Sequence, residues 1–167
     1  KAENKKALQE QMGLPVNPDV PLIGIVSRMV SQKGFDLVKY SMEELLQADA
    51  QFVVLGSGDW EYESFFDEMA ARYPHKMALR LGFIPSLAHQ IYAGADMFLM
   101  PSKFEPCGLA QLVALRYGTL PIVRETGGLK DTIIDCGDEG GYGFTFKTYN
   151  AGDMAGAVYR GLGLYSN

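Results

Sequence analysis

The chain is poor in cysteine, in net charge and in long apolar runs, and each shortage excludes a class of protein. Two cysteines among 167 residues, Cys107 and Cys136, are too few for a disulfide framework, so free thiols and a reducing compartment are expected. The formal net charge of −5 excludes broad electrostatic attraction to nucleic acid or to an anionic membrane. No apolar run approaches the roughly 20 residues that a membrane-spanning helix needs. Because the net charge is negative, any phosphate site must be local.

The composition is that of an ordinary globular domain. Hydrophobic residues make up 47% of the chain and charged residues 21%, and the length suits one domain with a full core. The first eleven residues are charged and polar, unlike a signal peptide. The first residue is not Met, and the sequence stops directly after a helical pattern. We therefore expect a piece of a longer polypeptide.

Apolar, β-rich segments alternate with helical patterns along the chain. Strands are expected at residues 21–27, 51–55, 77–81, 96–100 and 120–123, with a short sixth at 143–146. Helical spacing is found at residues 34–47, 59–73, 87–93, 108–117 and 153–164, with a helical turn at 129–134. Continuous apolar strands separated by helices are typical of a parallel sheet covered on both faces. The sequence predicts one α/β domain over residues 1–167, with a Rossmann-like, doubly wound parallel sheet.

In such a sheet the strand-to-helix loops gather at one edge. Right-handed crossovers place these loops at the carboxyl ends of the strands, where ligands of such sheets bind. Four loops should therefore converge, at residues 27–34, 56–59, 101–108 and 124–128.

The first loop carries two cations around the start of a helix. Arg28 and Lys33, together with unpaired backbone N–H groups, would suit a diphosphate. Two solvated surface cations are the alternative, because the segment is not a Gly-rich loop ending in Gly-Lys-Ser/Thr.

The second loop contains Gly56 and Gly58 and is followed by Asp59, which could cap the next helix. A dinucleotide fingerprint would need a third glycine where the chain has Glu61, and an acid at the end of the next strand, where it has Leu81. A nicotinamide-dependent oxidoreductase is therefore disfavoured. The glycines permit either a tight turn or a close backbone approach to a ligand.

The segment PSKFEPCGL at residues 101–109 is the most informative. Glu105 lies just before a helix start near Gly108, and the N–H groups of residues 107–109 could face an anion. The carboxylate could bind sugar hydroxyls or simply cap the helix. Cys107 as a nucleophile is disfavoured because neither histidine lies near it in sequence.

These residues together resemble the bacterial glycogen synthases and plant starch synthases, glycosyltransferase family 5. The matching strings are SRMVSQKGFDL, VVLGSGD, YAGADMFLMPSKFEPCGLAQLVALRYGTLPIVRETGGLKDT and GYGFTF, in the family's order and over nearly the whole chain. The resemblance covers the C-terminal, donor-binding half of a two-domain GT-B glycosyltransferase. It implies transfer of glucose from ADP-glucose to the non-reducing end of an α-1,4-glucan, with retention of configuration.

The resemblance also implies residue roles. Arg28 and Lys33 match the pair that grips the donor diphosphate and stabilises charge on the leaving ADP, and Glu105 matches the carboxylate that orients the donor. Further donor contacts are implied for Gly24, Ser27, Gly56, Phe83, Cys107, Gly108, Leu109, Thr126, Gly127 and Gly128. Phe83 stands where relatives often place a Tyr against adenine, so it keeps a stacking face without the hydroxyl. Neither a metal nor a cofactor is implied, since ADP-glucose is the substrate and ADP the product.

The resemblance implies that the N-terminal acceptor domain is absent from this sequence and that the fragment alone transfers no glucose. The implied partners are the nucleotide-sugar donor and, in the full enzyme, the glucan primer and the N-terminal domain; neither nucleic acid nor a membrane is expected. The implied compartment is the bacterial cytoplasm, or a plastid for a plant protein. The alternative is a non-catalytic nucleotide-sugar-binding or regulatory module of the same fold. No residue decides between ADP-glucose and UDP-glucose.

Overall fold

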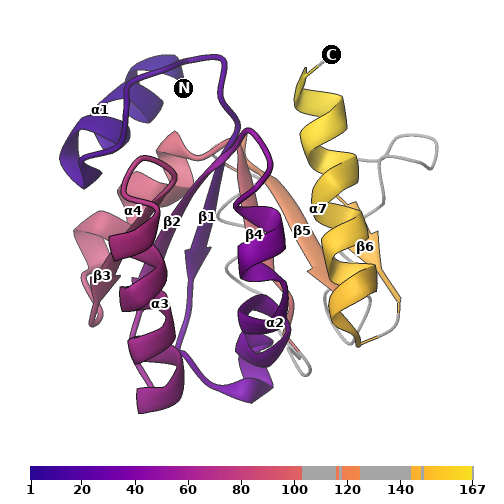
Figure 1. Cartoon of the computed structure of the whole chain (residues 1–167). Coiled ribbons are helices and arrows are strands. Elements are labelled where there is room, and N and C mark those ends of the chain that lie inside the picture. Colours follow the sequence, from indigo (N-terminus) through magenta and orange to yellow (C-terminus); the bar gives the residue numbers. More distant parts are fainter. Residues whose placement is uncertain (103–115, 117, 125–143, 148, 167) are drawn as a thin grey trace.

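A computed structural model describes residues 1–102, 116, 118–124, 144–147 and 149–166. Six strands form one sheet: β1 (Leu22–Val26), β2 (Gln51–Gly56), β3 (Met77–Leu81), β4 (Met97–Met100), β5 (Leu120–Arg124) and β6 (Phe144–Phe146). All neighbouring strands are parallel, in the order β3-β2-β1-β4-β5-β6 (Figure 1). This is the strand order of a doubly wound sheet, so the predicted fold class and all six predicted strands are confirmed.

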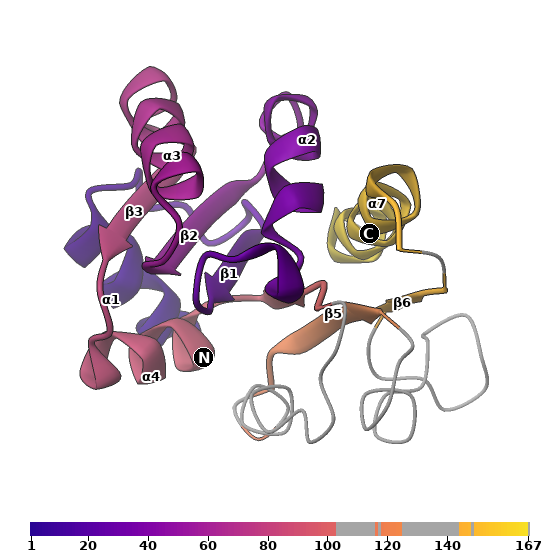
Figure 2. The same ribbon diagram turned by 90° about the horizontal axis from the view of Figure 1, so that it is seen from below.

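Helices cover both faces of the sheet, as predicted. Figure 2 shows α2 (Phe35–Leu45), α3 (Trp60–Arg72) and α7 (Ala151–Ser166) over one face, and α1 (Ala2–Met12) and α4 (Pro85–Gly94) over the other. The larger apolar core lies under α2, α3 and α7 and includes the fully buried Phe35, Phe52 and Phe66. A second core joins α1 and α4 to the strands through residues such as Leu8 and Ile91. Burial on both faces explains why the strands are continuous apolar runs.

Helix α1 was not predicted, because its buried side includes polar side chains. Lys5 is only 3% exposed, and its ammonium lies 2.8 Å from the carboxylate of Asp96. Gln9 is fully buried and donates to the side-chain carbonyl of Gln51 at 2.8 Å. Since buried polar groups are tolerated when they are paired, tertiary contacts hold a helix that the apolar pattern did not reveal.

The ends of the predicted helices 34–47, 59–73, 87–93 and 153–164 lie within two residues of the observed ends, with one difference in chemistry. Asp59 occupies the N-cap position of α3, but its side chain makes no capping hydrogen bond. Instead the carboxylate of Glu63 accepts the Gly58 N–H at 2.8 Å. The predicted helical segments 108–117 and 129–134 lie outside the described residues, apart from Arg116, which is helical. Within the described part of the chain, no helix is long and apolar enough to cross a membrane.

Candidate functional site

The order of the strands reverses between β1 and β4, and the loops that follow these two strands meet there. Gly34 ends the loop after β1, and Pro101 begins the segment after β4. A β-carbon placed on Gly34 would lie 2.3 Å from the carbonyl oxygen of Pro101, far inside van der Waals contact. The two backbones therefore touch at the point where doubly wound sheets bind their ligands, as the loop prediction required.

The loop after β1 is also joined to the loop after β2. The Met29 N–H donates to the Ser57 carbonyl at 2.8 Å, and the Asp59 N–H donates to the Met29 carbonyl at 2.9 Å. Met29 and Gly58 form an isolated parallel bridge, and the Met29 side chain is fully buried in the larger core. This anchored residue fixes the backbone directly beside Arg28. Convergence of the loops 27–34 and 56–59 is confirmed.

Two of the predicted donor-binding glycines are required by packing. A β-carbon on Gly56 would lie 1.8 Å from the Ser27 carbonyl oxygen. Gly24 is in the middle of β1, where a β-carbon would lie 2.4 Å from Cγ2 of Ile91 on α4. In both cases the close neighbour is the protein itself, which accounts for the glycine without a ligand. Donor contacts of Gly24, Gly56 and the half-buried Ser27 stay predictions.

The two predicted cations lie on this anchored loop at the carboxyl edge of the sheet. Arg28 is exposed, and Lys33 is half-buried at the end of a short 3-10 turn, Ser31–Lys33. Gly34 follows with φ +86°, and α2 begins at the next residue. The positive end of α2 therefore faces the same edge as both cations, which is favourable for an anion. Their contact with a diphosphate stays a prediction.

Phe83 follows β3 on the same edge. It is 80% exposed, and the neighbouring Gly82 N–H donates to the Gly56 carbonyl at 3.0 Å. Leu81 and Ile84 beside it are also partly exposed, at 47% and 38%. The exposed ring follows a residue that is bonded to the end of β2, so it is available for the stacking on a base that the resemblance implies. The stacking itself stays a prediction.

The loop that follows β6 also reaches this edge, and it was not among the predicted site segments. The hydroxyl of Tyr149 lies 2.9 Å from the Ser31 carbonyl oxygen and 2.5 Å from Oδ1 of Asp36. The guanidinium of Arg124, at the end of β5, lies 5.4 Å from the centre of the Tyr149 ring. Burial, followed by the hydrogen bond to Asp36, raises the pKa of Tyr149. The phenol therefore stays a hydrogen-bond donor at all ordinary pH values.

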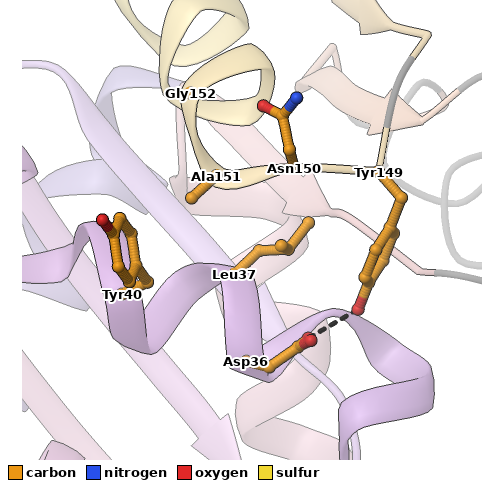
Figure 3. Close-up of a pocket in the computed structure, with 7 residues that line it drawn as sticks. All are labelled: Asp36, Leu37, Tyr40, Tyr149, Asn150, Ala151 and Gly152. Carbon is orange, nitrogen blue, oxygen red and sulfur yellow. Dashed lines mark hydrogen bonds between the residues drawn. The ribbon is translucent and has the colours of Figure 1, made fainter.

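A shallow pocket of about 450 Å³ lies beside this contact, between α2 and the start of α7 (Figure 3). Tyr40, which is 86% exposed, forms one side, and Asn150 and Ala151 form another. The hydrogen-bonded pair of Asp36 and Tyr149 also lines it, as Figure 3 shows.

The remaining predicted residues lie outside the described part of the chain. They are Glu105, Cys107, Gly108, Leu109, Thr126, Gly127 and Gly128. Their roles stay predictions. Pro101 and Ser102, which precede them, are buried, and Arg124, which ends β5, lies between the two groups in sequence. Among the described residues no group of three or more His, Cys, Asp or Glu side chains could hold a metal ion.

Comparison with known proteins gives consistent similarities. The family model of the glycosyl transferases group 1 matches residues 8–162. A glycogen synthase of Geobacillus thermodenitrificans (strain NG80-2) is 57% identical over 164 residues, which are 97% of this chain and 34% of that protein. A glycogen synthase of Bacillus cereus (strain B4264) is 53% identical over 167 residues, 99% of this chain and 35% of that protein.

Among solved structures, the catalytic domain of starch synthase IV from Arabidopsis thaliana, bound to ADP and acarbose, is similar with a TM-score of 0.91 and 36% identity. The similarity covers 99% of this chain and 36% of that one. The chain thus spans about a third of the length of the relatives that it matches. These similarities confirm the resemblance and the fold class predicted from the sequence.

Proposed function

The chain belongs to the glycosyl transferases group 1, and from this premise we propose that it is the donor-binding domain of a glycogen or starch synthase. The complete protein transfers glucose from ADP-glucose to the non-reducing end of an α-1,4-glucan, with retention of configuration. The relatives support the choice of reaction, since they are glycogen synthases at 53–57% identity. Because the relatives compared above include bacterial proteins, the bacterial cytoplasm is the proposed compartment.

The observation that carries the proposal is the loop after β1. It holds two cations beside the start of α2, at the point where the strand order reverses. In the proposed reaction the bond between glucose and the diphosphate breaks, and negative charge develops on the leaving ADP. Cations held in fixed positions stabilise such developing charge more than they stabilise the bound substrate. Arg28 and Lys33 are proposed for this role.

The other groups at this edge are proposed to orient the donor. Phe83 stacks on the adenine, which its exposed ring allows. Glu105 binds hydroxyls of the donor sugar, and the backbone N–H groups of residues 107–109 and 126–128 face the sugar and the phosphates. The acceptor glucan is a partner of the complete protein, and the acceptor domain is another part of that protein. A domain that binds the donor but lacks the acceptor side transfers nothing by itself.

Calorimetry with ADP tests donor binding directly. ADP should bind this chain, and Arg28→Ala or Lys33→Ala should weaken binding, each by about tenfold, as expected for loss of one charge-assisted contact. Arg72→Ala and Lys39→Ala are matched controls, because these cations pair with Glu43 and Glu61 on the exposed surfaces of α2 and α3. Failure of the folded chain to bind ADP at millimolar concentration would contradict a preformed donor site.

Turnover by the complete protein separates the enzyme from the alternative, a non-catalytic nucleotide-sugar-binding module. The complete protein should extend glycogen with ADP-glucose, and Arg28→Ala should lower kcat more than it raises KM. A complete protein that binds ADP-glucose tightly but never transfers glucose would favour the non-catalytic module.

A further inference from the structure

The short turn Ser31–Lys33 is held from two sides by tyrosine hydroxyls. The Ser31 hydroxyl lies 2.6 Å from the hydroxyl of Tyr62, on α3. The carbonyl oxygen of the same residue accepts a hydrogen bond from Tyr149 at 2.9 Å, from the loop between β6 and α7. Two elements far apart in sequence thus fix one three-residue turn. A 3-10 turn of this length is not held in place by its own hydrogen bonds.

Tyr149 also ties the turn to two other parts of the edge. Its single hydroxyl proton is shared between the Ser31 carbonyl and Oδ1 of Asp36, in the first turn of α2 (Figure 3 shows the bond to Asp36). Arg124 at the end of β5 lies over its ring. The phenol therefore connects the loop after β1 with the end of β5, on the far side of β4.

We propose that Tyr149 is a positioning residue for the diphosphate-binding loop: its hydroxyl fixes Ser31, and through it Lys33, relative to the end of β5. The proposal rests on the proposed function, because it takes this loop as the one that binds the donor diphosphate. Tyr149 acts through the turn and touches no reacting atom.

Two effects follow from loss of the hydroxyl. The turn becomes free on one side, so binding of a diphosphate must also order Lys33. The entropy lost in that ordering weakens binding. The carboxylate of Asp36 also loses a donor, and its negative charge, three residues after Lys33, becomes free to turn toward the anion. Both effects act on phosphate binding, and neither acts on recognition of the base.

The test is Tyr149→Phe in the complete protein, which removes the hydroxyl and keeps the ring against Arg124. Titration calorimetry should show ADP bound about three- to tenfold more weakly, as loss of one hydrogen bond predicts, with unchanged stoichiometry. Adenosine, which has no phosphate, should bind as it does to the unchanged protein. Irreversibly unfolded protein would lower the stoichiometry, and reversible partial unfolding would weaken the binding of ADP and of adenosine by the same factor. A purely structural role therefore gives a different result.

Tyr159→Phe is the matched control. The hydroxyl of Tyr159 on α7 donates to Glu44 on α2 at 3.1 Å, so the variant also removes a tyrosine–carboxylate bond between the same two regions, away from the turn. Equal effects of the two variants on ADP binding, or equal weakening of ADP and adenosine by Tyr149→Phe, would overturn the proposal. If Tyr149→Phe does not fold, Tyr62→Phe tests the same turn from α3 and should weaken ADP alone. Absence of ADP binding to the unchanged protein would reject the proposed function itself, and this inference with it.

Discussion

The α-carbon of Gly34 lies so close to the backbone of Pro101 that no side chain fits between them: a β-carbon would lie 2.3 Å from the Pro101 oxygen. The φ of Gly34, +86°, belongs to the left-handed region, which also favours glycine. This single contact joins the loop after β1 to the end of β4 across the reversal in strand order. It therefore fixes the proposed diphosphate loop against Pro101, the first residue after β4.

Gly34→Ala should be strongly destabilising, because both the backbone conformation and the space oppose a methyl group. Left-handed backbone costs a non-glycine residue about 1–2 kcal/mol, and a forced backbone shift adds about 1–3 kcal/mol. Urea unfolding should therefore show a loss of about 2–5 kcal/mol. Gly13→Ala is the control: Gly13 has a φ of +74°, but no atom lies within 4 Å of its β-carbon position. If Gly34→Ala lowers the free energy of unfolding no more than Gly13→Ala does, the backbone at Pro101 moves aside at little cost.

The ion pair of Lys5 and Asp96 should matter far more than an exposed pair. Both side chains are at least nine-tenths buried, and Asp96 also accepts the Leu22 N–H at 2.9 Å. Asp96→Ala leaves an ammonium buried without its carboxylate and should lower the free energy of unfolding by about 3–5 kcal/mol. Disruption of the exposed pair of Lys39 and Glu61 by Lys39→Ala should cost under about 1 kcal/mol in the same urea titration. Similar losses for the two pairs would contradict this prediction.

Tyr149 should give the folded chain a specific sensitivity to alkaline pH. Burial and the bond to Asp36 raise the pKa of Tyr149 above its ordinary value of 10.0, so in the folded state it keeps its proton after the unfolded phenol has lost it. The stability contributed by this group is full below about pH 10 and is lost as pH rises through the folded pKa. In unfolding titrations between about pH 9 and 11, Tyr149→Phe should reduce the decline of stability with pH. An unchanged slope would mean that other groups cause the decline.

The sheet could be predicted from the sequence because each strand is a short, continuous apolar run. Strands such as Met77–Leu81 were located to the residue, and the edge where the loops meet follows from the parallel arrangement alone. Helix α1 could not be predicted, because its burial depends on the partners of Lys5 and Gln9, which lie far away in sequence. Local periodicity contains no information about such pairs.

The same limit applies within the candidate site. Arg28 and Lys33 stand out because two cations flank a helix start after a strand. Tyr149 does not, because its partners Ser31 and Asp36 are 118 and 113 residues away. One signal was available: Tyr149 follows the sixth predicted strand, so the rule that gathered the other four loops at one edge applied to this loop as well.

Phe83 should contribute to nucleotide affinity without contributing to stability. Its ring is 80% exposed, so its removal leaves no cavity in the core, and Phe83→Ala should shift the unfolding midpoint little. Stacking on a base is worth about 1–3 kcal/mol, so calorimetry should show ADP and adenosine both weakened by about fivefold or more. Trp60→Ala is the matched control, because Trp60 is an aromatic residue with 81% exposure at the start of α3. If Phe83→Ala weakens ADP binding no more than Trp60→Ala does, the adenine lies elsewhere on this edge. If Phe83→Ala weakens the binding of ADP but not of adenosine, Phe83 acts on the phosphates and not on the base.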